Sequence, residues 1–302
     1  MNMTTRRLAK PVYKRQQFLL SFIKEFDESL TATDIQKLLF LYHKKNNPSH
    51  YDFVPYLFGG FSIQAFEDIN TLQAMGWLSD TDGKIRYAGN KTLGVNIPLE
   101  GLGDSVSDQL PTVRGNQLVK IVYEQYPYYA INSRIAASLM SVESMARIKA
   151  EKEQLKQTGK MLFTIGYEGL SIERYLECLI RNDVRVLCDI RSNPLSRKLG
   201  FSKSHLCKYL PNVGIEYVHL PELGIISEKR NNLSSDEDYK NLFAEYKSSL
   251  LKHGECLNRL YQLFEDKGRI ALTCFEHEPS HCHRHVVRDY LKETYKVEAT
   301  DL

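Results

Sequence analysis

Side chains that could do chemistry follow four short apolar runs in the second half of the chain. The runs end in Gly-Tyr-Glu-Gly (166–169), Asp-Ile-Arg-Ser (189–192), His-Leu-Pro-Glu (219–222) and Cys-Phe-Glu-His (274–277). In an open parallel sheet, ligands bind outside the carboxyl ends of the strands. If the four runs are neighbouring strands, we expect Tyr167, Asp189, His219 and Cys274 to lie at the mouth of one cleft.

Four cations near this predicted edge favour an anionic ligand. They are Arg191, Arg197, Lys203 and Arg284, and the last is expected in the first turn of a helix, where unpaired N–H groups also favour an anion. Guanidinium groups suit phosphate and carboxylate oxygens, so we predict a phosphate-bearing ligand such as a nucleotide or nucleic acid. The alternative is a structural ion-pair set, in which Asp189 and Glu222 hold the arginines. The other candidate ligand-binding residues are Tyr167, His219, Glu222, Cys274, Glu276 and His283.

Two carboxylates are candidates for general acid–base work, Glu168 and Asp189. Paired acids near a cationic pocket suit cleavage of an N-glycosidic or phosphoester bond. Asp189 is the better candidate because it follows a buried run and precedes an arginine by two residues. Glu168 could equally be an ordinary turn residue.

Cysteines and histidines are dense near the last run. All six cysteines lie between Cys178 and Cys282, and none forms a Cys-x-x-Cys pair. Cys282 is a candidate thiolate nucleophile, activated by an arginine or a helix N-terminus. Metal binding is the other functional alternative, but the spacing matches no standard zinc pattern, so we assign no metal ligand from the sequence. Structural packing of the thiols is the remaining interpretation. The residues weighed for metal binding are Cys274, His277, His281, Cys282, His283 and His285.

Strands and helices alternate through this half, which predicts an α/β fold. Strands are expected over 161–165, 184–190, 215–220 and 269–274, with helices over 171–180, 204–210, 239–264 and 283–293. The strands are continuous Val/Ile/Leu runs, which is typical of an open parallel sheet with helices on both faces. We place this α/β domain at residues 161–302, behind a connecting helix or linker at 144–160.

The first half, residues 1–143, is predicted to be mainly helical. Helices are expected over 12–26, after a Thr33 cap, and from a Ser62 cap through Met75, before a hairpin around Asp82-Gly83. This order is that of a winged helix, so an arm and a wing could contact phosphates of duplex DNA. A solvated surface on an interaction domain is the alternative. The basic residues concerned are Arg6, Arg7, Lys10, Lys14, Arg15, Lys84 and Arg86.

Several motifs carry a family resemblance. Thr164–Gly169 (TIGYEG), Asp189–Arg197 (DIRSNPLSR), Phe201–Lys203, His219–Gly224 (HLPELG) and Cys274–Arg284 (CFEHEPSHCHR) resemble the bacterial DUF488 family, a domain of unknown function. The resemblance implies a fold and a site at these residues, but no reaction. In the first half, LLFLYHKK, FVPYLFGGFS and Gly76-Trp77-Leu78 resemble the antitoxin-like Panacea domains, which implies a regulatory or protein-binding role.

Composition limits the remaining classes. The chain has 302 residues, 42% of them hydrophobic and 25% charged, with a net charge of +3. This is an ordinary globular composition of about two domains, which excludes collagen, a coiled coil or a disordered chain. No apolar stretch approaches the roughly 20 residues of a membrane span, and the basic N-terminus lacks a signal-peptide pattern. We therefore expect a cytoplasmic protein with reduced thiols.

Together these features predict an enzyme domain that acts on a nucleotide or nucleic acid, behind a module that binds DNA or a partner protein. A non-catalytic regulator that senses a phosphorylated ligand is the first alternative. A thiol- or metal-dependent redox enzyme is the second. The sequence points to no particular cofactor.

Overall fold

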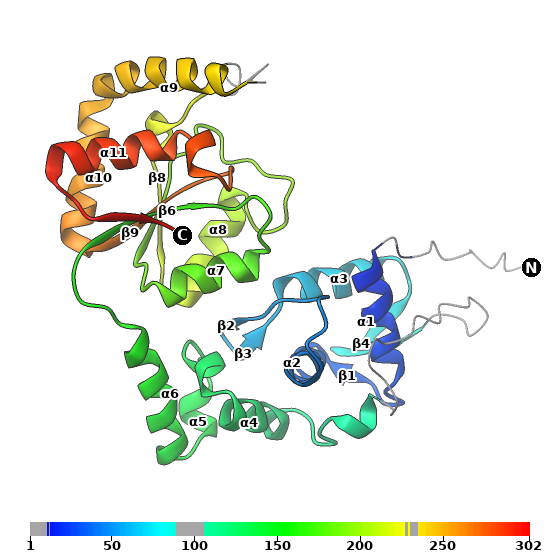
Figure 1. The fold of residues 1–302 in the computed structure, drawn as a ribbon. Coiled ribbons are helices and arrows are strands. Elements are labelled where there is room, and N and C mark those ends of the chain that lie inside the picture. Colours follow the sequence, from blue (N-terminus) through cyan, green and yellow to red (C-terminus); the bar gives the residue numbers. More distant parts are fainter. Residues whose placement is uncertain (1–10, 12, 89–105, 227–228, 230–234) are drawn as a thin grey trace, which may run out of the picture. The chain divides into compact units, whose positions relative to one another are not determined.

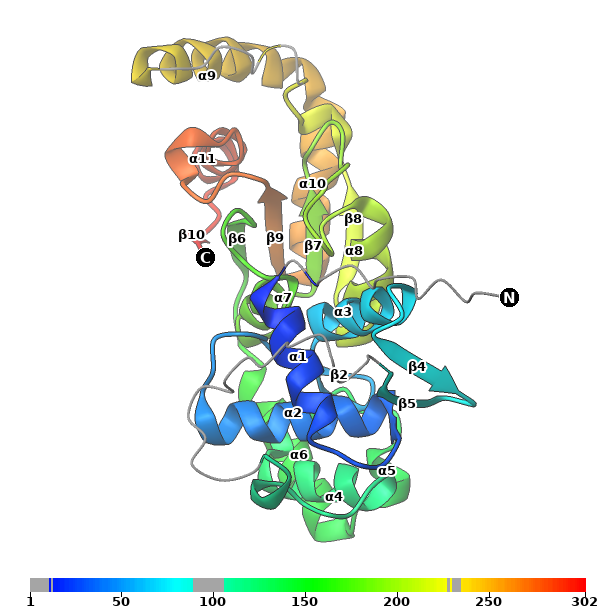
Figure 2. The same ribbon diagram turned by 90° about the vertical axis from the view of Figure 1, so that its right-hand side faces the viewer.

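The chain folds into two compact units, Met1–Lys152 and Glu153–Leu302. The structure is a computed structural model, and it describes residues 11, 13–88, 106–226, 229 and 235–302. Figure 1 and Figure 2 show the two units as ribbons in perpendicular views. Each unit is described separately below.

The C-terminal unit is built on a five-stranded parallel sheet. The strand order is β10-β6-β9-β7-β8, so the first and last strands of the unit are neighbours at one side. The strand bounds are β6 Met161–Gly166, β7 Val186–Asp189, β8 Glu216–His219, β9 Arg269–Cys274 and β10 Ala299–Asp301. The predicted parallel α/β sheet is therefore confirmed, with the addition of β10.

The three central strands form because their residues can be buried on both faces. Every residue of β7 and β9 is buried, as is all of β6 after Met161. One face packs Leu162, Val186 and Ile270 against Leu260 and Val287 of the helices. Burial of large apolar side chains such as these stabilises the fold by about 1.5–3 kcal/mol each.

Helices cover both faces of this sheet. On one face Tyr175 of α7 donates a hydrogen bond to Thr273 of β9 over 2.7 Å. On the other, α10 and α11 pack against β9. The single helix expected over 239–264 is divided at residues 251–253, and α9 runs past α11 in Figure 1. The helix bounds are α7 Ile172–Arg181, α8 Lys203–Tyr209, α9 Asp236–Leu250, α10 Gly254–Lys267 and α11 Arg284–Tyr295.

The N-terminal unit combines helices with two small antiparallel sheets, β1-β5-β4 and β2-β3. The hairpin between β4 and β5 turns at Asp82 and Gly83, which both have positive φ, as a two-residue turn requires. The helix bounds are α1 Lys14–Lys24, α2 Ala32–Asn46, α3 Ile63–Ala74, α4 Asn116–Gln125, α5 Ala136–Leu139 and α6 Val142–Leu155. The strand bounds are β1 Leu30–Thr31, β2 Val54–Tyr56, β3 Gly59–Phe61, β4 Leu78–Thr81 and β5 Lys84–Tyr87.

Helix starts in this unit follow from their capping residues. Ser62 caps α3, as expected. The prediction that Thr33 caps the preceding helix is wrong, because Thr31 and Asp34 form a reciprocal capping box that begins α2 at Ala32. Across the described residues, no helix combines the length and apolar character needed to cross a membrane.

Candidate functional site

The carboxyl ends of four neighbouring strands bring the predicted polar groups to one edge of the sheet. Gly166 at the end of β6 is paired with Cys274 of β9, and Asp189 of β7 is paired with His219 of β8. Asp189 is also opposite Thr273, the penultimate residue of β9. The structure therefore places Tyr167, Asp189, His219 and Cys274 along a single edge, which we call the rim.

A buried ion pair occupies the centre of the rim. Asp189 is fully buried and Arg191 is 6% exposed. The Arg191 Nε lies 2.8 Å from Asp189 Oδ1, and its Nη2 lies 2.5 Å from Oδ2. The Tyr217 hydroxyl donates to the same Oδ2 over 2.7 Å. Burial alone would lower the pKa of Arg191. The hydrogen bonds that Arg191 donates to Asp189, together with the negative charge of Asp189, outweigh burial and raise the pKa of Arg191 above its ordinary value.

These contacts change the role expected for Asp189. A general base needs a lone pair that can reach a substrate proton. Both oxygens of Asp189 already accept hydrogen bonds, and none of the carboxylate is exposed. The structure favours Asp189 as the residue that holds Arg191 in place, which is the ion-pair alternative that the sequence also allows.

Aromatic side chains also pack around the guanidinium of Arg191 and the tyrosine that it contacts. The Tyr167 hydroxyl accepts a hydrogen bond from Arg191 Nη1 over 2.8 Å. The Tyr167 ring stacks on Phe201 at 4.4 Å and meets Phe275 edge-on at 5.3 Å. Phe275 is 43% exposed, whereas Phe201 is buried. Phe275 therefore offers an accessible ring face beside the ion pair.

A polar pocket of about 340 Å³ opens at this part of the rim. We call it the rim pocket. Arg191, Arg197 and Cys274 are the predicted site residues that line it, together with Tyr167. Arg197 is exposed, and among the described residues it makes no hydrogen bond or ion pair. The remaining lining residues, which the sequence did not single out, are Ser192, Asn193, Leu195, Ser196, Ile225 and Phe275.

Lys203 and His219 contact each other beside the rim pocket and do not line it. The Lys203 ammonium lies 3.2 Å from His219 Nδ1, and His219 Nε2 lies 2.9 Å from the carbonyl oxygen of Arg191. The histidine therefore supports the loop after β7. Lys198, which the sequence analysis passed over, donates to the carbonyl of Tyr167 over 2.7 Å.

The three glutamates predicted to belong to the site, Glu168, Glu222 and Glu276, lie in different environments. Glu168 is exposed, and its Oε2 accepts the backbone N–H of His277 over 3.1 Å. Glu276 lies with Oε2 at 3.2 Å from the Cys274 sulfur. Glu222 is exposed and borders a different, smaller pocket, so it does not line the rim pocket.

Arg284 also departs from its predicted role as an anion ligand. Its side chain is fully buried, although it starts α11 as expected. Nε donates to the Thr164 hydroxyl over 3.0 Å, Nη1 donates to the carbonyl of Glu276, and Nη2 donates to that of His277 over 2.7 Å. Arg284 therefore ties the loop after β9 to β6.

Gly166 permits this close approach. A Cβ atom at Gly166 would lie 1.8 Å from the carbonyl oxygen of Glu276, a contact that a side chain cannot make. Gly166 of the first motif and Arg284 of the Cys-His-Arg motif thus both contact the loop after β9.

Two cysteines and a histidine form a buried cluster next to the rim pocket. Cys274 is 1% exposed, and Cys282 and His283 are not exposed at all. Burial first, and then the adjacent Cys274 thiol and Glu276 carboxylate, raise the pKa of Cys282 well above its ordinary value. A buried, protonated thiol that does not line the pocket is not a competent nucleophile, so the catalytic role predicted for Cys282 is not favoured.

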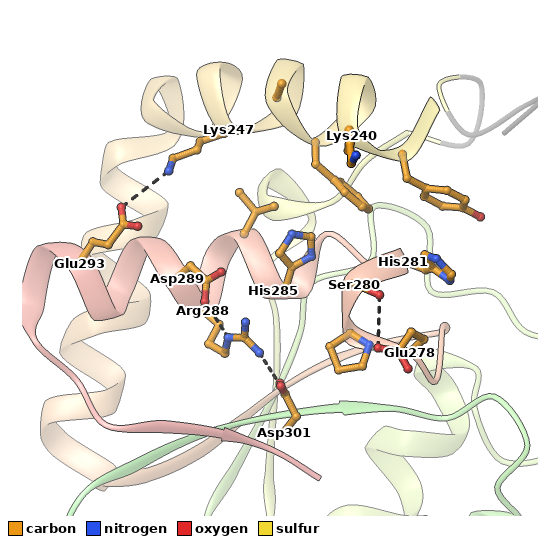
Figure 3. Close-up of a pocket in the computed structure, with 15 residues that line it drawn as sticks. Lys240, Lys247, Glu278, Ser280, His281, His285, Arg288, Asp289, Glu293 and Asp301 are labelled. Carbon is orange, nitrogen blue, oxygen red and sulfur yellow. Dashed lines mark hydrogen bonds and ion pairs between the residues drawn. The ribbon is translucent and has the colours of Figure 1, made fainter. Parts of the chain in front are cut away.

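The other histidines considered for metal binding lie apart from this cluster. His277 is exposed, His281 stacks on Tyr239 at 4.8 Å, and His285 meets Phe243 edge-on at 4.8 Å. Figure 3 shows His281 and His285 at a larger cavity of about 800 Å³ between α9 and α11.

The charges of this larger cavity are mostly paired with one another. Lys247 lies 3.7 Å from Glu293, and Arg288 contacts both Asp289 and Asp301 (Figure 3). Lys240 lines this cavity as well, but four carboxylates face its three cations, so the lining carries no net positive charge, whereas no carboxylate of the described residues lines the rim pocket. We therefore take the rim pocket as the candidate functional site.

The predicted basic surface of the N-terminal unit is only partly present. Lys14, Lys84 and Arg86 are exposed. Arg15 is instead paired with Asp68, with Nε 2.7 Å from Oδ2, so its charge is balanced within the N-terminal unit. Arg6, Arg7 and Lys10 lie outside the described residues.

Comparison with protein-family models identifies the family of the C-terminal domain. Residues 171–291 match the family described as Domain of unknown function DUF488. The C-terminal part of the chain therefore contains a DUF488 domain, which confirms the resemblance predicted from its motifs. No curated protein and no solved structure matches the chain. These comparisons give no support to the Panacea or winged-helix resemblance of the N-terminal part.

Proposed function

We propose that the C-terminal unit binds a phosphorylated ligand of the nucleotide class in the rim pocket and cleaves a glycosidic or phosphoester bond in it. The observation that carries this proposal is the guanidinium of Arg197 on a polar pocket at the carboxyl ends of parallel strands. Pockets of this size, with few placed polar groups, are typical of small-molecule sites.

Arg197 supplies the net positive charge of the rim pocket. The charge of Arg191 is balanced by Asp189 at 2.5 Å, so it adds hydrogen-bond donors and little net field. Arg197 is exposed and borders the same cavity. A guanidinium binds two phosphate oxygens at once, which a point charge cannot do.

Aromatic rings supply a second binding element. Tyr167 and Phe275 line the pocket, and Phe275 is 43% exposed. Stacking of a nucleobase on such a ring is worth about 1–3 kcal/mol. A ligand with both a phosphate and a base would use Arg197 and Phe275 together.

Proton transfer falls to Glu168 in this proposal. Asp189 is committed to Arg191 and Tyr217, whereas Glu168 is exposed and, although it does not itself line the pocket, directly follows the lining residue Tyr167. General acid–base catalysis contributes typically about 10²–10⁴-fold to a rate. Glu168→Gln should therefore lose turnover by about that factor and keep ligand binding.

A second candidate function is a non-catalytic regulator that senses a phosphorylated ligand. The observation that favours it is the neutralised Asp189, which leaves the buried part of the pocket without an available acid or base. In that case the N-terminal unit would pass the signal to DNA or a partner protein, with the exposed Lys84 and Arg86 of β5 as contacts.

Calorimetric titration of the full chain with adenosine and guanosine monophosphate tests the binding step. We expect Arg197→Gln to weaken binding about tenfold or more, which corresponds to loss of a charged hydrogen bond. Arg174→Gln is the matched control, because Arg174 is exposed on α7 and does not line the pocket. Equal affinities for the two variants would refute the proposal.

Chromatographic analysis of the same mixtures separates the two candidate functions. Released base, or nucleoside plus phosphate, that disappears in Glu168→Gln identifies the enzyme. Binding without any product identifies the regulator.

A further inference from the structure

Three metal-binding side chains come together at the start of α11. The sulfurs of Cys274 and Cys282 and the Nδ1 of His283 all lie within 4.8 Å of one another. All three residues are buried. Thiolate and imidazole are the preferred ligands of zinc and similar divalent ions in proteins.

The spacing of the three atoms fits one tetrahedral ion. With Zn–S of about 2.3 Å and Zn–N of about 2.0–2.1 Å, adjacent S and N ligands stand roughly 3.6 Å apart. The Nδ1 of His283 lies 3.7 Å from the Cys274 sulfur and 4.0 Å from the Cys282 sulfur. The two S–N distances therefore need to change by only a few tenths of an ångström, and the two sulfurs lie within 4.8 Å of each other.

The other ring nitrogen of His283 is already oriented. His283 Nε2 lies 3.1 Å from the carbonyl oxygen of Ile190, and this contact needs the proton on Nε2. The lone pair is then on Nδ1, which faces the two sulfurs. A backbone carbonyl on the second nitrogen is the usual support of a metal-binding histidine. The ring of Tyr246 packs edge-on against His283 at 5.5 Å and limits its rotation.

Arg284 positions the loop that spaces the two cysteines. Its guanidinium binds the carbonyls of Glu276 and His277, which lie between Cys274 and Cys282 in the chain. The Cys-His-Arg motif thus contains two side chains of the cluster and the residue that holds its loop.

We propose that Cys274, Cys282 and His283 form a binding site for a zinc-like divalent transition-metal ion. This proposal goes beyond the proposed function and does not depend on it. Two thiolates balance the charge of a divalent ion, so the buried site carries no net charge. Each thiol releases its proton to solvent as the metal binds.

Glu276 lies beside the cluster and is not one of its three ligand groups. Its Oε2 lies 3.2 Å from the sulfur of Cys274, and Cys274 is the member of the cluster that lines the rim pocket. Three protein ligands beside the rim pocket leave the fourth position of the metal to a water or a ligand oxygen, as in open zinc sites.

Zinc titration of the reduced full chain tests the site, with the metal stripped first and a chromophoric chelator as competitor. We expect one zinc per chain, measured by elemental mass spectrometry. Cys282→Ser should weaken zinc binding by about 100-fold or more. Loss of a residue that only hydrogen-bonds a metal ligand weakens metal binding by about 10–100-fold, so a larger loss marks a direct ligand. Cys207→Ser is the matched control, because Cys207 is exposed on α8.

Cobalt substitution of the wild-type chain avoids dependence on a variant that could misfold. A tetrahedral Co²⁺ site with two thiolates gives intense visible bands and a sulfur-to-metal charge-transfer band. Absence of zinc uptake by the reduced protein would overturn the proposal. It would do so even if Cys274 and Cys282 were found to form a disulfide under oxidising conditions. So would a cobalt adduct without the charge-transfer band, or equal weakening by Cys207→Ser and Cys282→Ser.

Discussion

Replacement of Asp189 by asparagine tests the role that the structure gives to the buried ion pair. The change keeps the shape of the side chain and removes the charge that balances Arg191. Arg191 is 6% exposed, so its guanidinium cannot recover the loss by turning to water. We therefore expect Asp189→Asn to act mainly on the stability of the C-terminal unit.

The size of the effect follows from the contacts. Asp189 accepts from Arg191 Nε at 2.8 Å, Arg191 Nη2 at 2.5 Å and the Tyr217 hydroxyl at 2.7 Å. Removing one partner of a buried ion pair costs about 3–5 kcal/mol, whereas an exposed pair is worth about 0–1 kcal/mol. For a unit of this size, 3–5 kcal/mol lowers Tm by roughly 10 °C.

The single tryptophan lets the two units be followed separately. Trp77 is buried in the N-terminal unit, so its fluorescence reports the unfolding of that unit, while circular dichroism reports both. Asp189→Asn should lower the denaturant midpoint for unfolding of the C-terminal unit. That transition is seen by circular dichroism and not by Trp77 fluorescence. Glu216→Gln is the control, because it breaks an exposed ion pair with Lys267 in the same sheet.

A stability loss below 1 kcal/mol, equal to that of Glu216→Gln, would refute the reasoning. The double variant Asp189→Leu with Arg191→Met adds a second check. A buried pair replaced by apolar side chains should cost less than the sum of the two single changes. Additive costs would show that Asp189 and Arg191 do not act as a pair.

Three further changes have defined outcomes. Burial lowers the pKa of Lys37 to about 7 from 10.5. The unfolded chain therefore binds the extra proton between these values, so the contribution of Lys37 to stability should rise with pH from pH 7 to pH 10.5, by about 1.4 kcal/mol per pH unit. Lys37→Met should abolish that slope in urea titrations compared across pH with the wild type; equal slopes would contradict the burial of this amine. Gly166→Ala places a Cβ 1.8 Å from the Glu276 carbonyl, so thermal denaturation should show a loss of about 3 kcal/mol or more, and a wild-type Tm would contradict the geometry. Arg284→Met leaves the Glu276 carbonyl without its donor, and should increase amide hydrogen exchange in the loop after β9; unchanged exchange there would show that Arg284 does not hold the loop.

The fold of the C-terminal unit could be predicted because its three central strands are buried on both faces. Continuous apolar runs such as 269–274 leave little choice but a central parallel strand. The last strand, β10, could not be predicted in this way. Its residues Ala299–Asp301 are partly exposed at the edge of the sheet, so they carry no apolar pattern.

The location of the candidate site followed from topology, but the roles of its residues did not. Residue type alone cannot show whether an arginine faces a pocket, as Arg197 does, or backbone carbonyls, as Arg284 does. The sequence allows an ion pair between Asp189 and an arginine, but only the structure shows that the pair with Arg191 is buried. Tyr217 was missed because a tyrosine within an apolar run gives no sign that its hydroxyl reaches a carboxylate on the next strand.

Native mass spectrometry of the freshly purified full chain, beside Arg197→Gln, tests the central claim most directly. We predict that the wild-type chain retains a small phosphorus-containing molecule, identified after denaturation, and that Arg197→Gln retains much less of it. Equal retention by both proteins, or a retained molecule without phosphorus, would contradict a phosphate-binding rim pocket.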